Sequence, residues 1–226
     1  MSQSPPPTRV KGGPPLWLWG LLAIFTIAVI AGVISSSTPE DPQAIFEDLN
    51  GNGMKMDSKT FKARLEKLRR YDGYDVQVTY LQGVLSHRER RDPRALELLA
   101  KVPEDHELKA EALEVMGAAH RRMANFEDSM TCYEQSVAKA PESSGKTRVA
   151  LAEMYYGIGA QQLAENTLDE AIEHDAELMP AYKTRALIKV SQKRFDEAIE
   201  DFKQFLSTPG DFSAATPEVL GGLTER

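Results

Sequence analysis

The sequence predicts an all-α protein, a solenoid of helical hairpins that follows a single N-terminal transmembrane helix. Two observations lead to this fold class. Small and large apolar residues recur in register at steps of 34, 35 and 34 residues, which indicates a repeat architecture. An uncharged apolar run of 19 residues also lies near the N-terminus, and a run of that length is a candidate membrane span.

The N-terminal segment predicts a membrane anchor. Residues 1–15 are polar and rich in proline, as is typical of a disordered tail. Residues 16–34 form the uncharged run, which at ~1.5 Å per residue nearly matches the ~30 Å hydrocarbon core. Arg9 and Lys11 precede it without any acidic residue. The positive-inside tendency therefore predicts a single-pass protein with a cytoplasmic N-terminus and a periplasmic repeat domain. A signal peptide cleaved after Ser35–Ser37 is the alternative.

A linker and a degenerate hairpin follow, at residues 35–41 and 42–75. The second stretch keeps the apolar places of the later repeats but lacks their small residues, as terminal repeats that cap a stack often do. Those apolar residues are Ile45, Leu49, Phe61, Leu65 and Leu68.

An Asx-rich segment interrupts this first hairpin. Asp48, Asn50 and Asn52 alternate ahead of Gly53, a spacing similar to that of an EF-hand calcium loop. Lys59 stands where that loop needs a bidentate carboxylate, and Asn and Gly are also ordinary turn residues. We therefore predict a turn without a metal site. A calcium-responsive protein using the Asp48–Asn52 loop is the alternative.

Four complete hairpins are predicted at residues 76–109, 110–144, 145–178 and 179–212. In each unit, counted from its first residue, positions 8 and 20 are small and position 24 is large and apolar. Position 8 holds Gly83, Gly117, Ala152 and Ala186; position 20 holds Ala95, Ser129, Ala164 and Ala198; position 24 holds Leu99, Tyr133, Leu168 and Phe202. Small residues at these places predict two closely packed helices per unit. Residues 213–226, with a Thr216-Pro217 helix-start signal, predict a C-terminal cap or tail.

This pattern resembles the tetratricopeptide repeat (TPR) family, whose period is about 34 residues. The resemblance covers residues 76–212. It implies that the first helices of successive units line a concave groove that binds a protein or peptide through positions 2, 5, 9, 12 and 13. The partner-binding residues predicted on this basis are Tyr80, His87, Arg88, Arg121, Arg122, Tyr156 and Lys183. Their basic character suits an acidic or C-terminal peptide.

Composition and motifs exclude other function classes. The formal net charge is −7, which is a poor match for nucleic acid. The sequence contains no phosphate-cradling glycine loop, no HExxH and no GxSxG motif, so no catalytic residues and no cofactor are predicted. Cys132 is the single cysteine, and its place beside the core residue Tyr133 indicates a structural thiol.

The expected function is that of a membrane-tethered TPR scaffold in the bacterial cell envelope, which binds a partner protein or peptide without catalysing a reaction. Tethering through residues 16–34 would raise its concentration near membrane partners. Self-association through unsealed ends of the solenoid is a further possibility of this architecture. The alternative within the same fold is a cytosol-facing receptor on an organelle.

Overall fold

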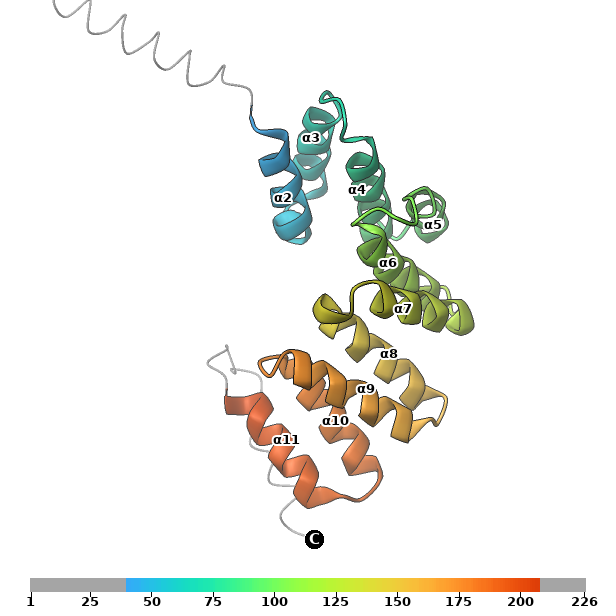
Figure 1. The fold of residues 1–226 in the computed structure, drawn as a ribbon, viewed down its shortest axis with the longest axis vertical. Coiled ribbons are helices and arrows are strands. Elements are labelled where there is room, and N and C mark those ends of the chain that lie inside the picture. The colour runs from blue at the N-terminus through green and yellow to red at the C-terminus, as the bar shows by residue number, and fades with distance from the viewer. Residues whose placement is uncertain (1–39, 208–226) are drawn as a thin grey trace, which may run out of the picture. The chain divides into compact units, whose positions relative to one another are not determined.

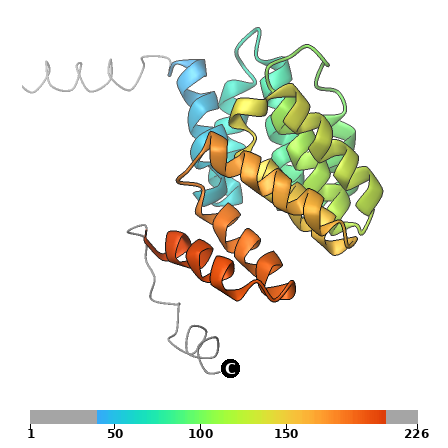
Figure 2. The same cartoon turned by 60° about the horizontal axis from the view of Figure 1, so that its bottom comes forward.

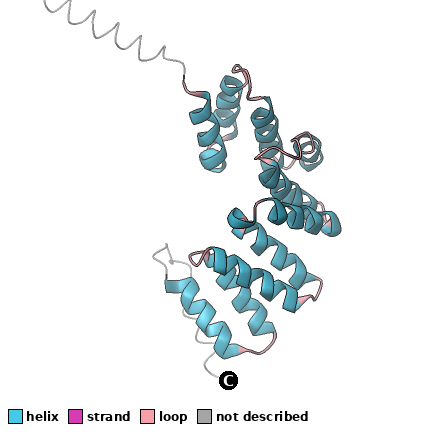
Figure 3. Ribbon diagram, viewed as in Figure 1, coloured by secondary structure: helices cyan, strands magenta, loops and turns pink. Residues whose placement is uncertain are grey.

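The computed structural model describes residues 40–207, and this part of the chain consists of helices and connecting turns without a β-strand (Figures 1 and 3). The described range holds ten α-helices and two short 3-10 helices, η1 (Gly53–Lys55) and η2 (Pro141–Ser143). The α-helices are α2 (Pro42–Asn52), α3 (Ser58–Leu68), α4 (Asp75–Arg88), α5 (Asp92–Leu99), α6 (Lys109–Arg122), α7 (Phe126–Lys139), α8 (Gly145–Gly157), α9 (Gln161–His174), α10 (Met179–Ser191) and α11 (Phe195–Ser207). The predicted all-α class is confirmed for this range.

The chain divides into two compact units, residues 1–45 and 46–226. In the first unit the structure describes only residues 40–45, which include the start of α2. Several predicted segments lie outside the described residues: the tail (1–15), the transmembrane segment (16–34), most of the linker (35–41) and the C-terminal cap or tail (213–226).

The predicted localisation is contradicted. No helix within residues 40–207 is long and apolar enough to cross a membrane. Even the 14-residue α6 and α7 rise only ~21 Å at ~1.5 Å per residue, against a hydrocarbon core of ~30 Å. A single-pass membrane protein with a periplasmic repeat domain is therefore not supported.

Four helical hairpins follow one another in the second unit. α4 packs on α5, α6 on α7, α8 on α9 and α10 on α11, and these are the most extensive helix contacts of the described chain. Neighbouring hairpins meet where α5 contacts α6, α7 contacts α8 and α9 contacts α10 (Figures 1 and 2). Each hairpin thus covers its apolar faces with its neighbours, as a solenoid requires.

The backbone of the hairpin turns repeats with the period of the sequence. One residue in each turn has a left-handed φ: Arg90 (59°), Ala124 (62°), Gly159 (83°) and Lys193 (62°). The residue after it donates its N–H back across the turn, as Asn125 N does to His120 O at 2.9 Å and Ala160 N to Tyr155 O at 2.8 Å. This pattern of a left-handed residue and a backward hydrogen bond is a Schellman-type helix end.

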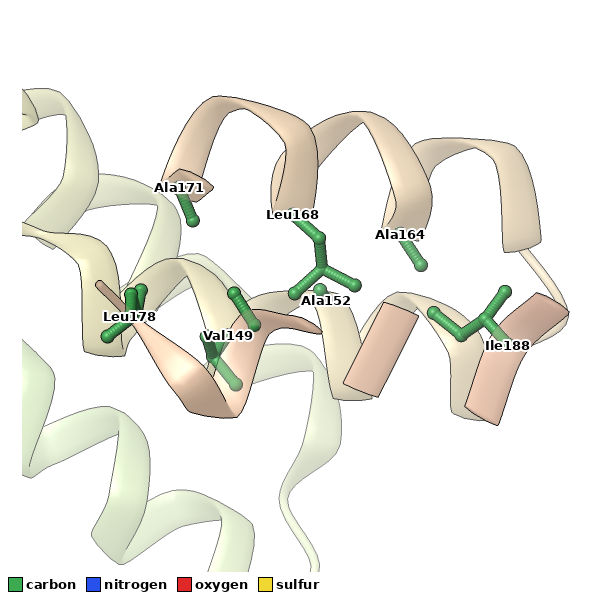
Figure 4. Close-up of a cluster of buried hydrophobic side chains, with 8 residues drawn as sticks. Val149, Ala152, Ala164, Leu168, Ala171, Leu178 and Ile188 are labelled. Atoms are coloured by element: carbon green, nitrogen blue, oxygen red, sulfur yellow. The ribbon is translucent and has the colours of Figure 1, made fainter. Parts of the chain in front are cut away.

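The core of each hairpin is built from a small residue facing a large one. A Cβ atom at Gly83 would lie 2.6 Å from Leu99 Cγ, so only glycine allows this approach of α4 to α5. The third hairpin repeats the arrangement with Ala152 and Leu168, both fully buried. Figure 4 shows Leu168 of α9 pointing at Ala152 of α8, within a cluster that also includes Ile188 of α10. The spacing of small and large residues therefore sets the distance between paired helices.

The Asx-rich segment differs from its prediction. α2 continues to Asn52, whereas the sequence predicted a turn from Asp48 onward. The Asp48 carboxylate accepts a hydrogen bond from Asn52 Nδ2 at 3.1 Å and forms an ion pair with Arg64 Nε at 3.0 Å. Because Asp48 and Asn50 are two residues apart on a helix, their side chains do not face each other. The loop needed for calcium is therefore not formed here.

Candidate protein-binding face on the first helices

The first helices of the hairpins contact one another as well as their own partners. α4 contacts α6 and α8 contacts α10, and Arg121 of α6 joins Glu153 of α8 in an ion pair of 3.0 Å. Side chains at equivalent repeat positions on these helices thus share one surface. We call it the first-helix face and define it by Arg121, Glu153, Tyr156, Lys183 and Leu187.

The first-helix face is partly apolar and partly charged. Tyr156 and Leu187 are 37% and 50% exposed, so apolar surface of both side chains is in contact with solvent. Lys183 places its Nζ 6.0 Å from the centroid of the Phe205 ring, a cation–π geometry. Arg121 and Glu153 are both more than 40% exposed, so their ion pair contributes little to stability. These groups are available to a ligand.

Tyr80 and Arg88, predicted for the groove, contact the preceding hairpin. Tyr80 is only 4% exposed, and its hydroxyl lies 3.2 Å from Asn50 Oδ1. Burial raises the pKa of this phenol well above its ordinary value. Arg88 donates a hydrogen bond to Gly53 O at 2.6 Å and another to Met56 O. Tyr80 therefore joins α4 to α2, and Arg88 joins α4 to the segment after α2. The structure does not bring them together with Tyr156 or Lys183.

The structure brings His87 and Arg122 together at Asp92. This aspartate opens α5 and is only 5% exposed. Arg122 Nε donates to Asp92 Oδ2 at 2.6 Å, and His87 Nδ1 lies 2.8 Å from Asp92 Oδ1. The guanidinium of Arg122 holds the pKa of the Asp92 carboxyl below its usual range. The cluster joins the turn of the first hairpin to the end of α6.

A second buried acid makes the equivalent junction further along the chain. Glu165 of α9 is 6% exposed. It accepts hydrogen bonds from Gln192 Nε2 at 2.6 Å and from Arg194 Nη1 at 2.7 Å. The sequence did not predict the role of Asp92 and Glu165 at these junctions. An acid in the first turns of a helix is explained by its favourable interaction with the helix dipole alone. The sequence likewise did not predict Glu153 and Leu187 of the first-helix face.

Residues 40–207 hold no group of three or more His, Cys, Asp or Glu side chains placed to bind a metal ion. Cys132 is buried, and its burial raises the pKa of the thiol, which lowers its nucleophilicity.

No protein-family model and no curated protein sequence matches the chain. Solved structures of TPR-containing proteins match its fold. A crystal structure of MamA matches with a TM-score of 0.56 and 19% sequence identity, covering 71% of this chain and 92% of that one. A structure of Pseudomonas aeruginosa pilF matches with a TM-score of 0.65 and 12% identity, covering 75% and 77%. This chain has the TPR fold.

MamA 41-end from Desulfovibrio magneticus RS-1 shows the same TPR fold, with a TM-score of 0.55 and 16% identity over 75% of this chain and 96% of that one. The TPR resemblance inferred from positions 8, 20 and 24 is thereby confirmed at the level of the fold. A TPR fold makes a scaffold for protein interactions plausible. The assignment of the seven predicted groove residues stays a prediction.

Proposed function

We propose that this TPR protein is a non-catalytic scaffold that binds a partner protein or peptide on the first-helix face. The observation that carries the proposal is the joint exposure of Tyr156 and Leu187 on neighbouring first helices. Tyrosine and arginine are typical anchors of protein interfaces, and a neighbouring exposed apolar side chain adds surface that a partner can bury.

The chemistry of the face favours a peptide with an apolar anchor next to an acidic group. The apolar anchor would bury the exposed surface of Tyr156 and Leu187. The acidic group would compete with Glu153 for Arg121, because the present ion pair is solvent-exposed and weak. Lys183 supplies a second cation on α10, two hairpins further along the chain. His87 and Arg122, predicted for the same role, are hydrogen-bonded to Asp92. In this proposal they hold the end of α6 in place beside the face.

The test is a selection of peptides from a displayed random library on the full-length chain, followed by measurement of Kd for the peptides recovered. We expect Tyr156→Ala/Leu187→Ala to weaken binding at least tenfold while the thermal melt stays close to wild type, because both side chains are exposed. Met54→Ala is the matched control, since Met54 is a 70% exposed apolar residue and is not part of the first-helix face. Equal affinity of the wild type and the double variant would show that the peptides bind elsewhere and would refute the proposal.

A further inference from the structure

A second exposed surface lies at the tips of the hairpins. Eight large hydrophobic side chains are exposed within residues 40–207, and five of them sit in or next to the turns that join α6 to α7, α8 to α9 and α10 to α11. These five are Met123 (40% exposed), Phe126 (53%), Ile158 (61%), Leu163 (47%) and Phe195 (46%). We call this set the hairpin-turn edge.

The three turns are neighbours in space. Arg194, which follows the last turn, donates to Glu165 near the start of α9 at 2.7 Å, and Gln192 of the same turn donates to Glu165 at 2.6 Å. The ion pair of Arg121 and Glu153 joins the end of α6 to α8, about one helical turn before the end of α8. The turns can be followed along one edge of the stacked hairpins in Figures 1 and 2.

The apolar character of this edge is not required by the turns themselves. The first hairpin makes the same left-handed turn at Arg90, which is the counterpart of Ala124. Its flanking residues, Glu89 and Arg91, are charged. A polar sequence therefore folds into this turn equally well. Large apolar side chains exposed along one edge, where the fold does not require them, indicate an interaction surface.

Two exposed charges on the edge, Glu127 and Lys193, are complementary to each other. The middle turn, residues 157–162 with the sequence GIGAQQ, carries no charge. Glu127 follows the turn on one side of it, and Lys193 lies in the turn on the other side. Both are exposed. The structure shows no ion pair of either side chain with another residue in the range 40–207, whereas the nearby Arg121, Arg122 and Arg194 are already paired within the chain.

We propose that the hairpin-turn edge is the interface between two copies of this chain. A two-fold axis at the middle turn packs Ile158 and Leu163 of one copy on the same residues of the other. The axis brings the first turn of one copy opposite the last turn of the other. Phe126 then meets Phe195, and Glu127 meets Lys193. The charged pairs fix the register, and the apolar centre supplies the driving force.

The test is the mass of the full-length protein in solution over a range of concentrations, measured by sedimentation velocity and light scattering. We expect a concentration-dependent dimer for the wild type. Ile158→Glu/Leu163→Glu should be monomeric at the same concentrations, because it buries four carboxylates in the dimer interface. Met54→Glu is the matched control and should leave the dimer intact. A wild type that stays monomeric at its highest soluble concentration would overturn the proposal, and so would a dimer that survives the double substitution.

The register is tested by exchanging the two charges. Glu127→Lys alone and Lys193→Glu alone should each raise the dimer Kd about five- to tenfold, because each breaks two symmetry-related ion pairs. The combined variant Glu127→Lys/Lys193→Glu restores the pairs with reversed polarity and should return Kd to near the wild-type value. If the combined variant is weaker than either single one, the two-fold arrangement about the middle turn is wrong.

Discussion

Gly117 of α6 faces the ring of Tyr133 in α7 so closely that a Cβ atom at residue 117 would lie 2.6 Å from Tyr133 Cε1. Tyr133 is 1% exposed, and its ring packs on Leu151 and Met154 of the next hairpin. The ring therefore has little room to move away. One glycine thus sets both the separation of two paired helices and the surface that the next hairpin packs against.

Gly117→Ala is expected to lower the free energy of unfolding by about 1–3 kcal/mol, the usual effect of overpacking a dense core. The measurement is urea denaturation of the full chain. Tyr133→Leu in the same background should recover part of the loss, because the third hairpin tolerates alanine opposite leucine at Ala152 and Leu168. Strictly additive effects of the two substitutions would contradict a direct contact.

At the left-handed turn residues, substitution by glycine is expected to raise stability or leave it unchanged, and substitution of glycine to lower it. Ala124 has φ of 62° and Gly159, its counterpart in the next hairpin, has φ of 83°. A left-handed backbone disfavours residues with a Cβ by about 1–2 kcal/mol. Gly159→Ala should therefore lower Tm, while Ala124→Gly should leave Tm unchanged or raise it. The comparison is made by thermal unfolding of both variants, and a drop in Tm for Ala124→Gly larger than for Gly159→Ala would refute the assignment.

Two buried hydroxyls join the helices of the second hairpin. Ser129 Oγ donates to Gly117 O and Ser136 Oγ donates to Ala110 O, each at 2.8 Å. Removing a buried donor in this way weakens folding by about 1 kcal/mol. We expect Ser136→Ala to lower the midpoint of urea unfolding without changing the slope. Thr131→Ala is the control, because Thr131 is exposed and bonds only within its own helix, to Glu127 O.

Arg121 and Arg122 are adjacent but are expected to differ in their contribution to stability. Arg122 donates to the buried Asp92, while Arg121 pairs with the exposed Glu153. Arg122→Ala should lower the free energy of unfolding by about 1.5–3 kcal/mol, since it leaves a buried carboxylate without its charged partner. Arg121→Ala should change it by less than about 1 kcal/mol. Chemical denaturation at neutral pH checks both values.

Asp92 also predicts a dependence of stability on pH. Its pKa lies below the ordinary value of 3.8 in the folded chain, so the folded state holds the ionised form more strongly than the unfolded state does. This stabilisation is present above the ordinary pKa and is lost as pH falls through the folded pKa. Asp92→Asn should therefore lose less stability than the wild type on acidification below about pH 4. Parallel acid dependence of the two proteins would show that Asp92 does not titrate as described.

Local features of the sequence were enough to predict the all-α class and the repeat. A small residue recurs at the position of Gly117 and a large one at the position of Tyr133, at steps of about 34 residues. The two are in contact within a hairpin, so their spacing along the chain predicts the repeat. The segment at Asp48 was wrongly predicted as a turn, because asparagine and glycine are turn formers by propensity. Instead, α2 continues to Asn52, where its side chain bonds Asp48, a local contact that propensity does not reveal.

The sequence by itself therefore determined the hairpins, their period and the small residues that let paired helices touch. The tertiary structure alone decided which polar side chains are exposed. Tyr80 and Lys183 hold the same repeat position, yet Tyr80 is buried and Lys183 exposed. Arg122 is bound to Asp92, 30 residues away along the chain. Such pairings depend on which segments the stacking of the hairpins brings within a few ångströms of each other. The spacing of residues inside one repeat does not predict these contacts between hairpins.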